Sequence, residues 1–314
     1  MHIHILGICG TFMGSLALLA KQAGHQVSGS DTNVYPPMST QLEESGIQLI
    51  EGFDPQQLCP SPDLVVVGNA MSRGNPCVEY MLDNRLAYIS GPQWLGENIL
   101  RDKHVLAVSG THGKTTTSSM LSKILDFAGL QPGFLIGGIP QDFGISARLS
   151  DGDYFVVEAD EYDSAFCDKR SKFVHYFAKT LMINNLEFDH ADIYQDLAEI
   201  IKTFRQLINL VPQNGLILAH AADTNINEIL PDAPAPVQTF GLETNAYWRA
   251  TDLEPGPQGT RFTLQRAGQS LGTFDLPMGG SYNVRNALAG LAAGFHAGLT
   301  LELMQSALSR FTGV

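Results

Sequence analysis

Cysteine is scarce in this 314-residue sequence, and its copies lie far apart. No two of them form a C-x-x-C pair, so the spacing indicates neither a zinc site nor a disulfide framework. The four residues are Cys9, Cys59, Cys77 and Cys167. Reduced thiols are typical of a cytoplasmic protein, which is the location we expect.

Long hydrophobic runs are lacking as well. No apolar stretch approaches the ~20 residues that a membrane span needs. The chain opens on "MHIHILGICG", which predicts a strand and a turn rather than the basic segment and cleavage site of a secretory signal. We therefore expect no association with a membrane.

Positive charge is in deficit. Lys and Arg together number 19 and Asp and Glu 32, which gives a formal net charge of −13. Nonspecific binding of nucleic acid needs a basic face, so this balance argues against it, and we expect no nucleic-acid partner. Small anionic substrates remain compatible with it, because backbone N–H groups and one or two lysines can hold a phosphate.

The length suggests about two domains, each large enough for its own core. In residues 2–100, short apolar runs alternate with helical segments, which predicts a parallel sheet with helices on both faces. A second unit opens at about residue 104 and includes an amphipathic helix over about 193–211. Near its end, "TRFTLQ" and "LGTFDL" predict antiparallel strands at the sheet edge, and two helices finish the chain. The expected fold class is α/β.

A glycine-rich turn follows the apolar strand "HVLAVSG" and leads into a helix at Lys114–Thr117. It is similar to the phosphate-binding loop G-x-x-x-x-G-K-[ST], although Val108 occupies the place of the first glycine. Backbone N–H groups and the positive end of the helix would hold phosphates there. A tight turn with a solvated lysine is the alternative, but the run G-K-T-T-T favours phosphate binding. The predicted nucleotide-binding residues are Gly110, Thr111, His112, Gly113, Lys114, Thr115 and Thr116.

Metal ligands are expected at neighbouring strand ends, where open α/β sheets bind their ligands. Glu158 ends the run "YFVVE", and His190 follows the strand "TLMINN". Because Mg²⁺ prefers hard oxygen ligands, Thr115, Glu158 and phosphate oxygens make a sensible first site. Chemistry alone favours a hydrogen-bonded loop histidine at position 190 over a metal ligand. The acidic run that starts at Glu158 is either part of this site or a solvated loop; it comprises Glu158, Asp160, Glu161 and Asp163.

Another glycine turn, "LGICGTFMGS", lies near the start of the chain with the spacing G-x-x-G-x-x-x-G at Gly7, Gly10 and Gly14. Asp31 closes the next strand 21 residues after Gly10, where dinucleotide-binding folds have a ribose-binding acid. A nicotinamide-dependent oxidoreductase is therefore one interpretation. The irregular spacing and the other nucleotide loop weaken it, and a sugar nucleotide can use the same helix N-terminus without nicotinamide. A structural turn with no ligand is the remaining alternative.

The chain resembles the Mur ligase family in four motifs: "GTHGKTTT", "EADEYD", "NNLEFDHADIY" and "NVRNALAGLAA". Members of this family are ATP-dependent enzymes that form amide bonds in peptidoglycan synthesis. That family's loop reads G-T-[NH]-G-K-T, so the missing first glycine is expected. The resemblance implies a Rossmann-like, UDP-N-acetylmuramate-binding domain over residues 1–103 and a P-loop ATP-binding domain over 104–314. It also implies the substrate-binding residues Gly7, Gly10, Thr11, Phe12, Met13, Asp31, Asn69 and Ala70.

Within the family, "VYPPMS", "GNAMSRGNP" and "DEYDSAFCDKRSKFVHY" resemble the member that joins the tripeptide L-alanyl-γ-D-glutamyl-meso-diaminopimelate to UDP-N-acetylmuramate in peptidoglycan recycling. The ligase that adds L-alanine in the biosynthetic route is the alternative. The family reaction has two steps: ATP phosphorylates the muramyl carboxylate, and the free amine of the peptide then attacks the acyl phosphate. The resemblance implies Lys114, Glu158 and His190 as catalytic residues, and Thr115, Glu158 and His190 as ligands of Mg²⁺.

The family recognises adenine with an H-N-x-x-N motif at the start of a helix. Here the sequence reads "YNVRN", so Asn283 and Asn286 match while Tyr282 replaces the histidine. Asn283 as a plain helix N-cap is the alternative. Family members also carry a third domain for the incoming peptide, and Val314 stands about where it would begin. The resemblance therefore implies a chain that binds UDP-N-acetylmuramate and Mg·ATP but ligates little, with its oligomeric state open.

Overall fold

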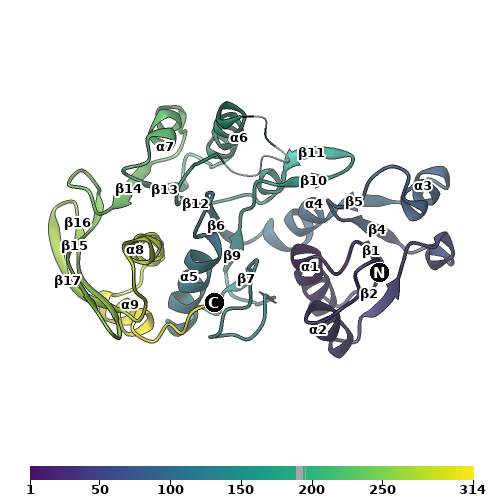
Figure 1. Ribbon diagram of the computed structural model, residues 1–314, viewed down its shortest axis with the longest axis horizontal. Coiled ribbons are helices and arrows are strands. Elements are labelled where there is room, and N and C mark those ends of the chain that lie inside the picture. Colours follow the sequence, from purple (N-terminus) through teal and green to yellow (C-terminus); the bar gives the residue numbers. More distant parts are fainter. Residues whose placement is uncertain (189–193, 195) are drawn as a thin grey trace. The chain divides into compact units, whose positions relative to one another are not determined.

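The computed structural model describes residues 1–188, 194 and 196–314. By its internal contacts the chain divides into two compact units (Figure 1). The first contains residues 1–101, 147–149 and 161–176, and the second contains residues 102–146, 150–160 and 177–314. Within this described part of the chain, no helix is both long and apolar enough to cross a membrane.

The first unit is built on a parallel sheet, as the sequence predicts. The sheet has five strands in the order β3-β2-β1-β4-β5. These strands are β1 (His2–Leu6), β2 (Gln26–Asp31), β3 (Gln48–Glu51), β4 (Leu64–Val67) and β5 (Tyr88–Ser90). The helices are α1 (Thr11–Gln22), α2 (Met38–Glu44), α3 (Pro76–Asp83) and α4 (Gly91–Leu95). The remaining strands of this unit are β8 (Ala147–Arg148) and the antiparallel pair β10 (Asp163–Ala165) and β11 (Asp168–Ser171).

Helices cover both faces of this sheet (Figure 1). On one face, Leu6 and Val65 of the central strands pack with Val78 and Met81 of α3, all fully buried. Full burial of one such side chain stabilises the fold by about 1.5–3 kcal/mol. Strands buried on both faces are typical of a parallel sheet between helix layers.

The second unit is built on a larger mixed sheet, and the strands that belong to this unit follow the order β17-β16-β15-β14-β13-β12-β6-β9-β7. Its strands are β6 (His104–Ser109), β7 (Gly133–Leu135), β9 (Tyr154–Glu158), β12 (Thr180–Ile183), β13 (Leu216–His220), β14 (Val237–Gly241), β15 (Trp248–Gly256), β16 (Gly259–Arg266) and β17 (Gln269–Leu276). Its helices are α5 (Lys114–Phe127), α6 (Leu197–Asn209), α7 (Thr224–Ile229), α8 (Ser281–His296) and α9 (Leu301–Leu308).

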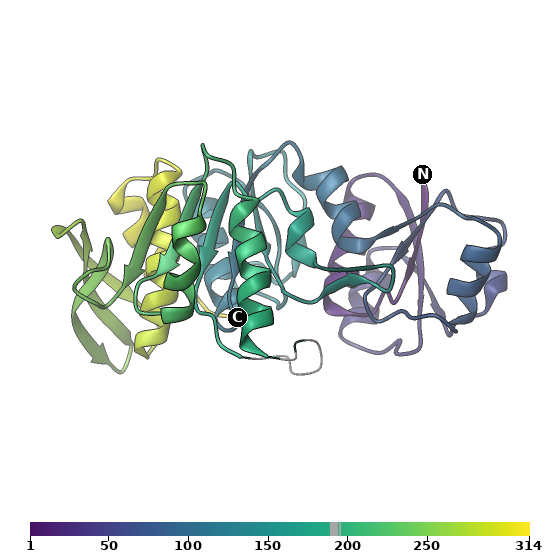
Figure 2. The same ribbon diagram turned by 90° about the horizontal axis from the view of Figure 1, so that it is seen from above.

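The predicted antiparallel edge is present, because β16 pairs with both β15 and β17 in antiparallel register. Figure 2 shows these light-green strands grouped at one end of the second unit. Helices α5, α8 and α9 cover one face of the sheet and α6 and α7 the other (Figure 1). A single apolar core joins α5 and α8 to strands β6, β12 and β15.

Helix α5 is positioned by glycines at both ends. Gly113 precedes it with φ +80°, and Gly129 follows it with φ +78°, a conformation that glycine adopts without strain. Its apolar face is buried at Leu121, Ile124 and Leu125.

Helix α6 begins later than the sequence predicts, at Leu197. The carboxylate of Asp196 accepts a hydrogen bond from the N–H of Glu199 and so caps the helix there. Part of the predicted first turn, including position 193, lies outside the described residues.

Candidate functional site

The predicted phosphate loop lies between β6 and α5. Val108, at the place of the missing glycine, is a buried residue of β6 whose carbonyl accepts the N–H of Ala159. Lys114 folds back over the loop and donates hydrogen bonds to the carbonyls of Gly110 (2.7 Å) and Thr111 (3.4 Å). The lysine, at the first position of α5, is therefore bonded to the loop rather than simply solvated.

Two glycines of this loop are required by close approach as well as by backbone conformation. A Cβ on Gly110 (φ +127°) would lie 2.9 Å from the carbonyl oxygen of Asn185. A Cβ on Gly113 would lie 2.6 Å from Asn286 Oδ1 and 3.2 Å from Asn184 Nδ2. Real Cβ atoms do not approach neighbours so closely, so any other residue would force the loop or its neighbours to move.

The first turn of α5 contains Thr115 and Thr116, both half-buried. The Thr115 hydroxyl donates to Glu158 Oε1 at the end of β9 over 3.1 Å. The other carboxylate oxygen, Oε2, accepts the N–H of Gly137 at 2.8 Å. Burial raises the pKa of the Glu158 carboxyl, and these two hydrogen bonds oppose that rise. The structure thus brings together two hard oxygen donors that the sequence predicts as Mg²⁺ ligands.

Among residues 1–188, 194 and 196–314, no group of three His, Cys, Asp or Glu side chains is placed to hold a metal ion. His190 lies outside the described residues. From the acidic run, Asp163 forms an ion pair with Lys169 at 2.7 Å, and Glu161 is buried in the first unit. Two protein oxygens still suit Mg²⁺, which is commonly bound by one or two carboxylates together with substrate phosphates and water.

The predicted adenine residues lie at the start of α8, next to the phosphate loop. The N-cap of α8 is Gly280, so the interpretation of Asn283 as the N-cap is wrong. Asn283 is buried and donates from Nδ2 to the carbonyl of Gly279 (2.8 Å), and Asn286 is buried beside Gly113. Tyr282 is 61% exposed, so its ring is accessible at the surface.

In the first unit, the predicted sugar-nucleotide residues lie at the carboxyl ends of β1, β2 and β4. Gly7 (φ +80°) donates its N–H to Ser30, and Gly10 is the N-cap of α1 with no side-chain cap. The carboxylate of Asp31 accepts the N–H of Cys9 (2.9 Å) and of Asn33 (3.1 Å). Asp31 therefore fixes the glycine turn against the end of β2.

The other residues predicted for this site surround the same helix end. Thr11 and Phe12 form the first turn of α1, Met13 is buried, and Asn69 and Ala70 form the turn after β4. Sequence reasoning missed Lys172, a buried lysine whose Nζ lies 5.1 Å from the ring centroid of Phe12. Nothing in the sequence spacing indicates this contact.

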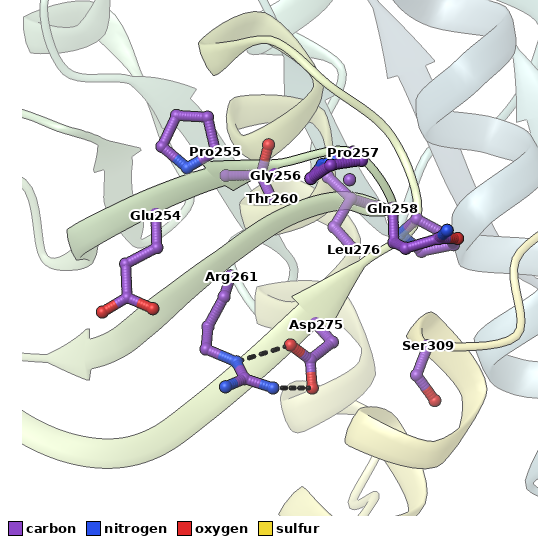
Figure 3. A pocket seen from close by; sticks show the side chains of 12 residues that line it. Glu254, Pro255, Gly256, Pro257, Gln258, Thr260, Arg261, Asp275, Leu276 and Ser309 are labelled. Atoms are coloured by element: carbon purple, nitrogen blue, oxygen red, sulfur yellow. Dashed lines mark hydrogen bonds and ion pairs between the residues drawn. The ribbon is translucent and has the colours of Figure 1, made fainter.

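A separate pocket of about 590 Å³ lies at the turn between β15 and β16 (Figure 3). Among its lining residues, the guanidinium of Arg261 is paired with the carboxylate of Asp275 through bonds of 2.7 and 3.3 Å. None of the predicted site residues lines this pocket. We assign it no ligand.

Comparison with known proteins adds to this geometry. The family model described as "Mur ligase family, catalytic domain" matches residues 2–103, and the "Mur ligase middle domain" matches residues 108–294. A relative from Haemophilus influenzae, UDP-N-acetylmuramate--L-alanyl-gamma-D-glutamyl-meso-2,6-diaminoheptandioate ligase, is 53% identical over 99% of this chain and 68% of its own length. The UDP-N-acetylmuramate--L-alanine ligase of Acetivibrio thermocellus is 35% identical over 100% of this chain and 65% of its own length.

Among solved structures, the UDP-N-acetylmuramate:L-alanyl-gamma-D-glutamyl-meso-diaminopimelate ligase of Neisseria meningitidis has a TM-score of 0.94 and 48% identity. That similarity covers 100% of this chain and 98% of the other. The chain thus spans about two thirds of the length of the curated relatives and nearly all of this solved one. These matches, which include both units, show that the chain belongs to the Mur ligase family.

Proposed function

We propose that this chain is the UDP-N-acetylmuramate- and ATP-binding part of a ligase that joins L-alanyl-γ-D-glutamyl-meso-diaminopimelate to UDP-N-acetylmuramate in peptidoglycan recycling. The observation that carries the proposal is 53% identity over 99% of the chain to a relative named for this reaction. The L-alanine-adding relative is only 35% identical, which favours the tripeptide as acceptor. A cytoplasmic location is part of the same proposal.

In the proposed reaction two anions must meet, the γ-phosphate of ATP and the carboxylate of the muramate. Lys114 supplies a positive charge at the phosphate loop, and the amides at the start of α5 add the positive end of a helix. Thr115 Oγ1 and the Glu158 carboxylate would hold Mg²⁺, and their 3.1 Å separation fits a pair of oxygen ligands to one ion. Bound Mg²⁺ would neutralise charge at the transferred phosphoryl group.

In the first unit, the proposed role of the glycine turn is to present the N-terminus of α1 to the diphosphate of the sugar nucleotide. No acidic residue lies in the first turn of α1, so its positive end is not offset locally. This use needs no nicotinamide. Membership of the Mur ligase family favours the ligase over the nicotinamide-dependent oxidoreductase.

Calorimetric titration tests the proposal directly on this chain. We expect selective binding of UDP-N-acetylmuramate, with UDP-N-acetylglucosamine and NADH as controls, and binding of ATP that strengthens with Mg²⁺. Binding of NADH with no binding of the muramate nucleotide would contradict the proposed function.

A further inference from the structure

Two N–H groups of the phosphate loop point toward one asparagine in a distant part of the chain. The N–H of Thr111 donates to the backbone carbonyl of Asn185 (3.2 Å), and the N–H of His112 donates to Asn185 Oδ1 (2.7 Å). In return, Asn185 Nδ2 donates to the carbonyl of His112 over 3.2 Å. The carboxamide of Asn185 thus holds both polar groups of the His112 backbone, although the two residues are 73 positions apart.

The same two segments are joined again at the neighbouring residue. The hydroxyl of Thr111 accepts a hydrogen bond from the backbone N–H of Glu187 (2.9 Å). The same hydroxyl donates a hydrogen bond to the backbone carbonyl of Glu187 (3.3 Å). Thr111 is 9% exposed, so these bonds are largely shielded from water. The segment after β12 therefore supports the loop along residues 111–112.

These bonds divide the loop into two parts. The amides of Thr111 and His112 face Asn185, which leaves phosphate binding to the amides that follow. The first intrahelical bond of α5 joins the N–H of Thr117 to the carbonyl of Gly113, so the amides before Thr117 belong to the helix end that binds anions.

We propose that Asn185 is a positioning residue for ATP: by fixing the His112 backbone it orients Gly113 and the amides after it toward the phosphates. The inference rests on the proposed function. A loop with glycines at positions 110 and 113 loses much conformational freedom when it is ordered. Ordering it before ATP arrives removes that cost from binding, as preorganisation generally does.

Asn185→Ala removes both carboxamide bonds, and Asn185→Asp keeps only the acceptor for the N–H of His112. Asn209→Ala is the matched control, because Asn209 is an exposed asparagine of the same unit whose Nδ2 also donates to a backbone carbonyl, that of Arg205 (2.8 Å). The measurements are calorimetric Kd values for ATP with Mg²⁺ and for UDP-N-acetylmuramate, and amide hydrogen exchange over residues 110–113.

For Asn185→Ala we expect about tenfold weaker ATP binding, an unchanged Kd for UDP-N-acetylmuramate, and faster exchange at His112. Asn185→Asp should keep slow exchange at His112 yet bind ATP more weakly, because it loses one bond and adds a negative charge. Asn209→Ala should match the unmodified chain in all three measurements.

Unmodified ATP affinity in Asn185→Ala, or unchanged exchange at His112, overturns the proposal. Should the alanine variant fail to fold, Asn185→Ser, whose shorter uncharged side chain cannot make both carboxamide bonds to His112, takes its place, and unmodified ATP affinity there has the same meaning. Absence of ATP binding in the unmodified chain would instead refute the proposed function, while the exchange data would still decide whether Asn185 fixes the loop.

Discussion

The hydroxyl of Thr115 lies 3.1 Å from Glu158 Oε1 and joins the first turn of α5 to the end of β9. The oxygen atoms of both side chains are suitable ligands for a cation. The other carboxylate oxygen of Glu158, Oε2, accepts a hydrogen bond from the N–H of Gly137. This second bond holds the carboxylate in place when Thr115 is released. The pair is therefore the part of the candidate site best prepared for Mg²⁺.

Replacement of Glu158 by Gln tests this role of the pair. Glu158→Gln keeps the size and polarity of the side chain but removes the negative charge that a divalent cation needs. We expect the strengthening of ATP binding by Mg²⁺ to fall at least about tenfold, with UDP-N-acetylmuramate binding unchanged. Calorimetry with and without Mg²⁺ measures both, and Glu302→Gln, at an exposed position of α9, is the control. Full Mg²⁺ dependence in the variant would remove Glu158 from the metal site.

Lys114→Ala is expected to abolish ATP binding and to leave binding of UDP-N-acetylmuramate intact. Each hydrogen bond from a charged donor contributes about 1.5–3 kcal/mol, and the lysine is the charged residue of the predicted loop. Titration of both nucleotides measures the effect, with Lys202→Ala, an exposed lysine of α6, as control. Loss of both ligands together would show that the two sites depend on each other.

The sequence predicts those parts of the fold that depend on local signals. The start of α5 follows from the G-K-T-T-T run, and its end follows from Gly129. The sequence places the start of α6 too early, because apolar periodicity continues before the Asp196 cap. The helix start depends on the conformation of one residue, Asp196, which the apolar pattern does not indicate.

Contacts across the sheet could not be predicted in the same way. The approach of Asn286 to Gly113, and the bonds between Asn185 and His112, join residues that are far apart in the sequence. Only the packing of β12 and α8 beside the loop brings them together. His190 as a metal ligand stays a prediction, because it lies outside the described residues.

A comparison of Gly113→Ala with Gly129→Ala separates two effects on stability: the steric clash of an added Cβ and the backbone strain of a positive φ. Both glycines border α5 with nearly equal φ, +80° and +78°, so each substitution costs roughly 1–2 kcal/mol of strain. A Cβ at Gly129 meets nothing within 4 Å, whereas one at Gly113 would lie 2.6 Å from Asn286 Oδ1.

We therefore expect Gly113→Ala to be less stable than Gly129→Ala by about 1–3 kcal/mol, the usual cost of overpacking. It should also lose ATP binding, which Gly129→Ala should retain. Urea denaturation and ATP titration of both variants provide the comparison. Equal stability and equal ATP affinity of the two variants would contradict the close approach at Gly113.

We expect His4 to make the stability of the chain sensitive to mild acid. His4 is buried in β1, where its ring nitrogens lie 2.9 Å from the Ser28 hydroxyl and 3.2 Å from the Ser30 hydroxyl. Burial, with a smaller effect from His2, lowers the pKa of His4 from 6.5 to about 4. The unfolded chain therefore binds a proton at a pH where the folded chain does not, and stability falls as the pH drops from 6.5 toward 4.

The loss attributable to this one residue is roughly 3 kcal/mol at pH 4, at about 1.4 kcal/mol per unit of pKa difference. His4→Gln keeps a polar side chain that does not titrate, so its free energy of unfolding should change less between pH 7 and pH 4.5 than that of the unmodified chain. Denaturation curves at both pH values measure the difference, and carboxyl groups that titrate in this range are common to both proteins. Equal pH dependence of the two would mean that His4 already binds a proton in the folded state near its ordinary pKa.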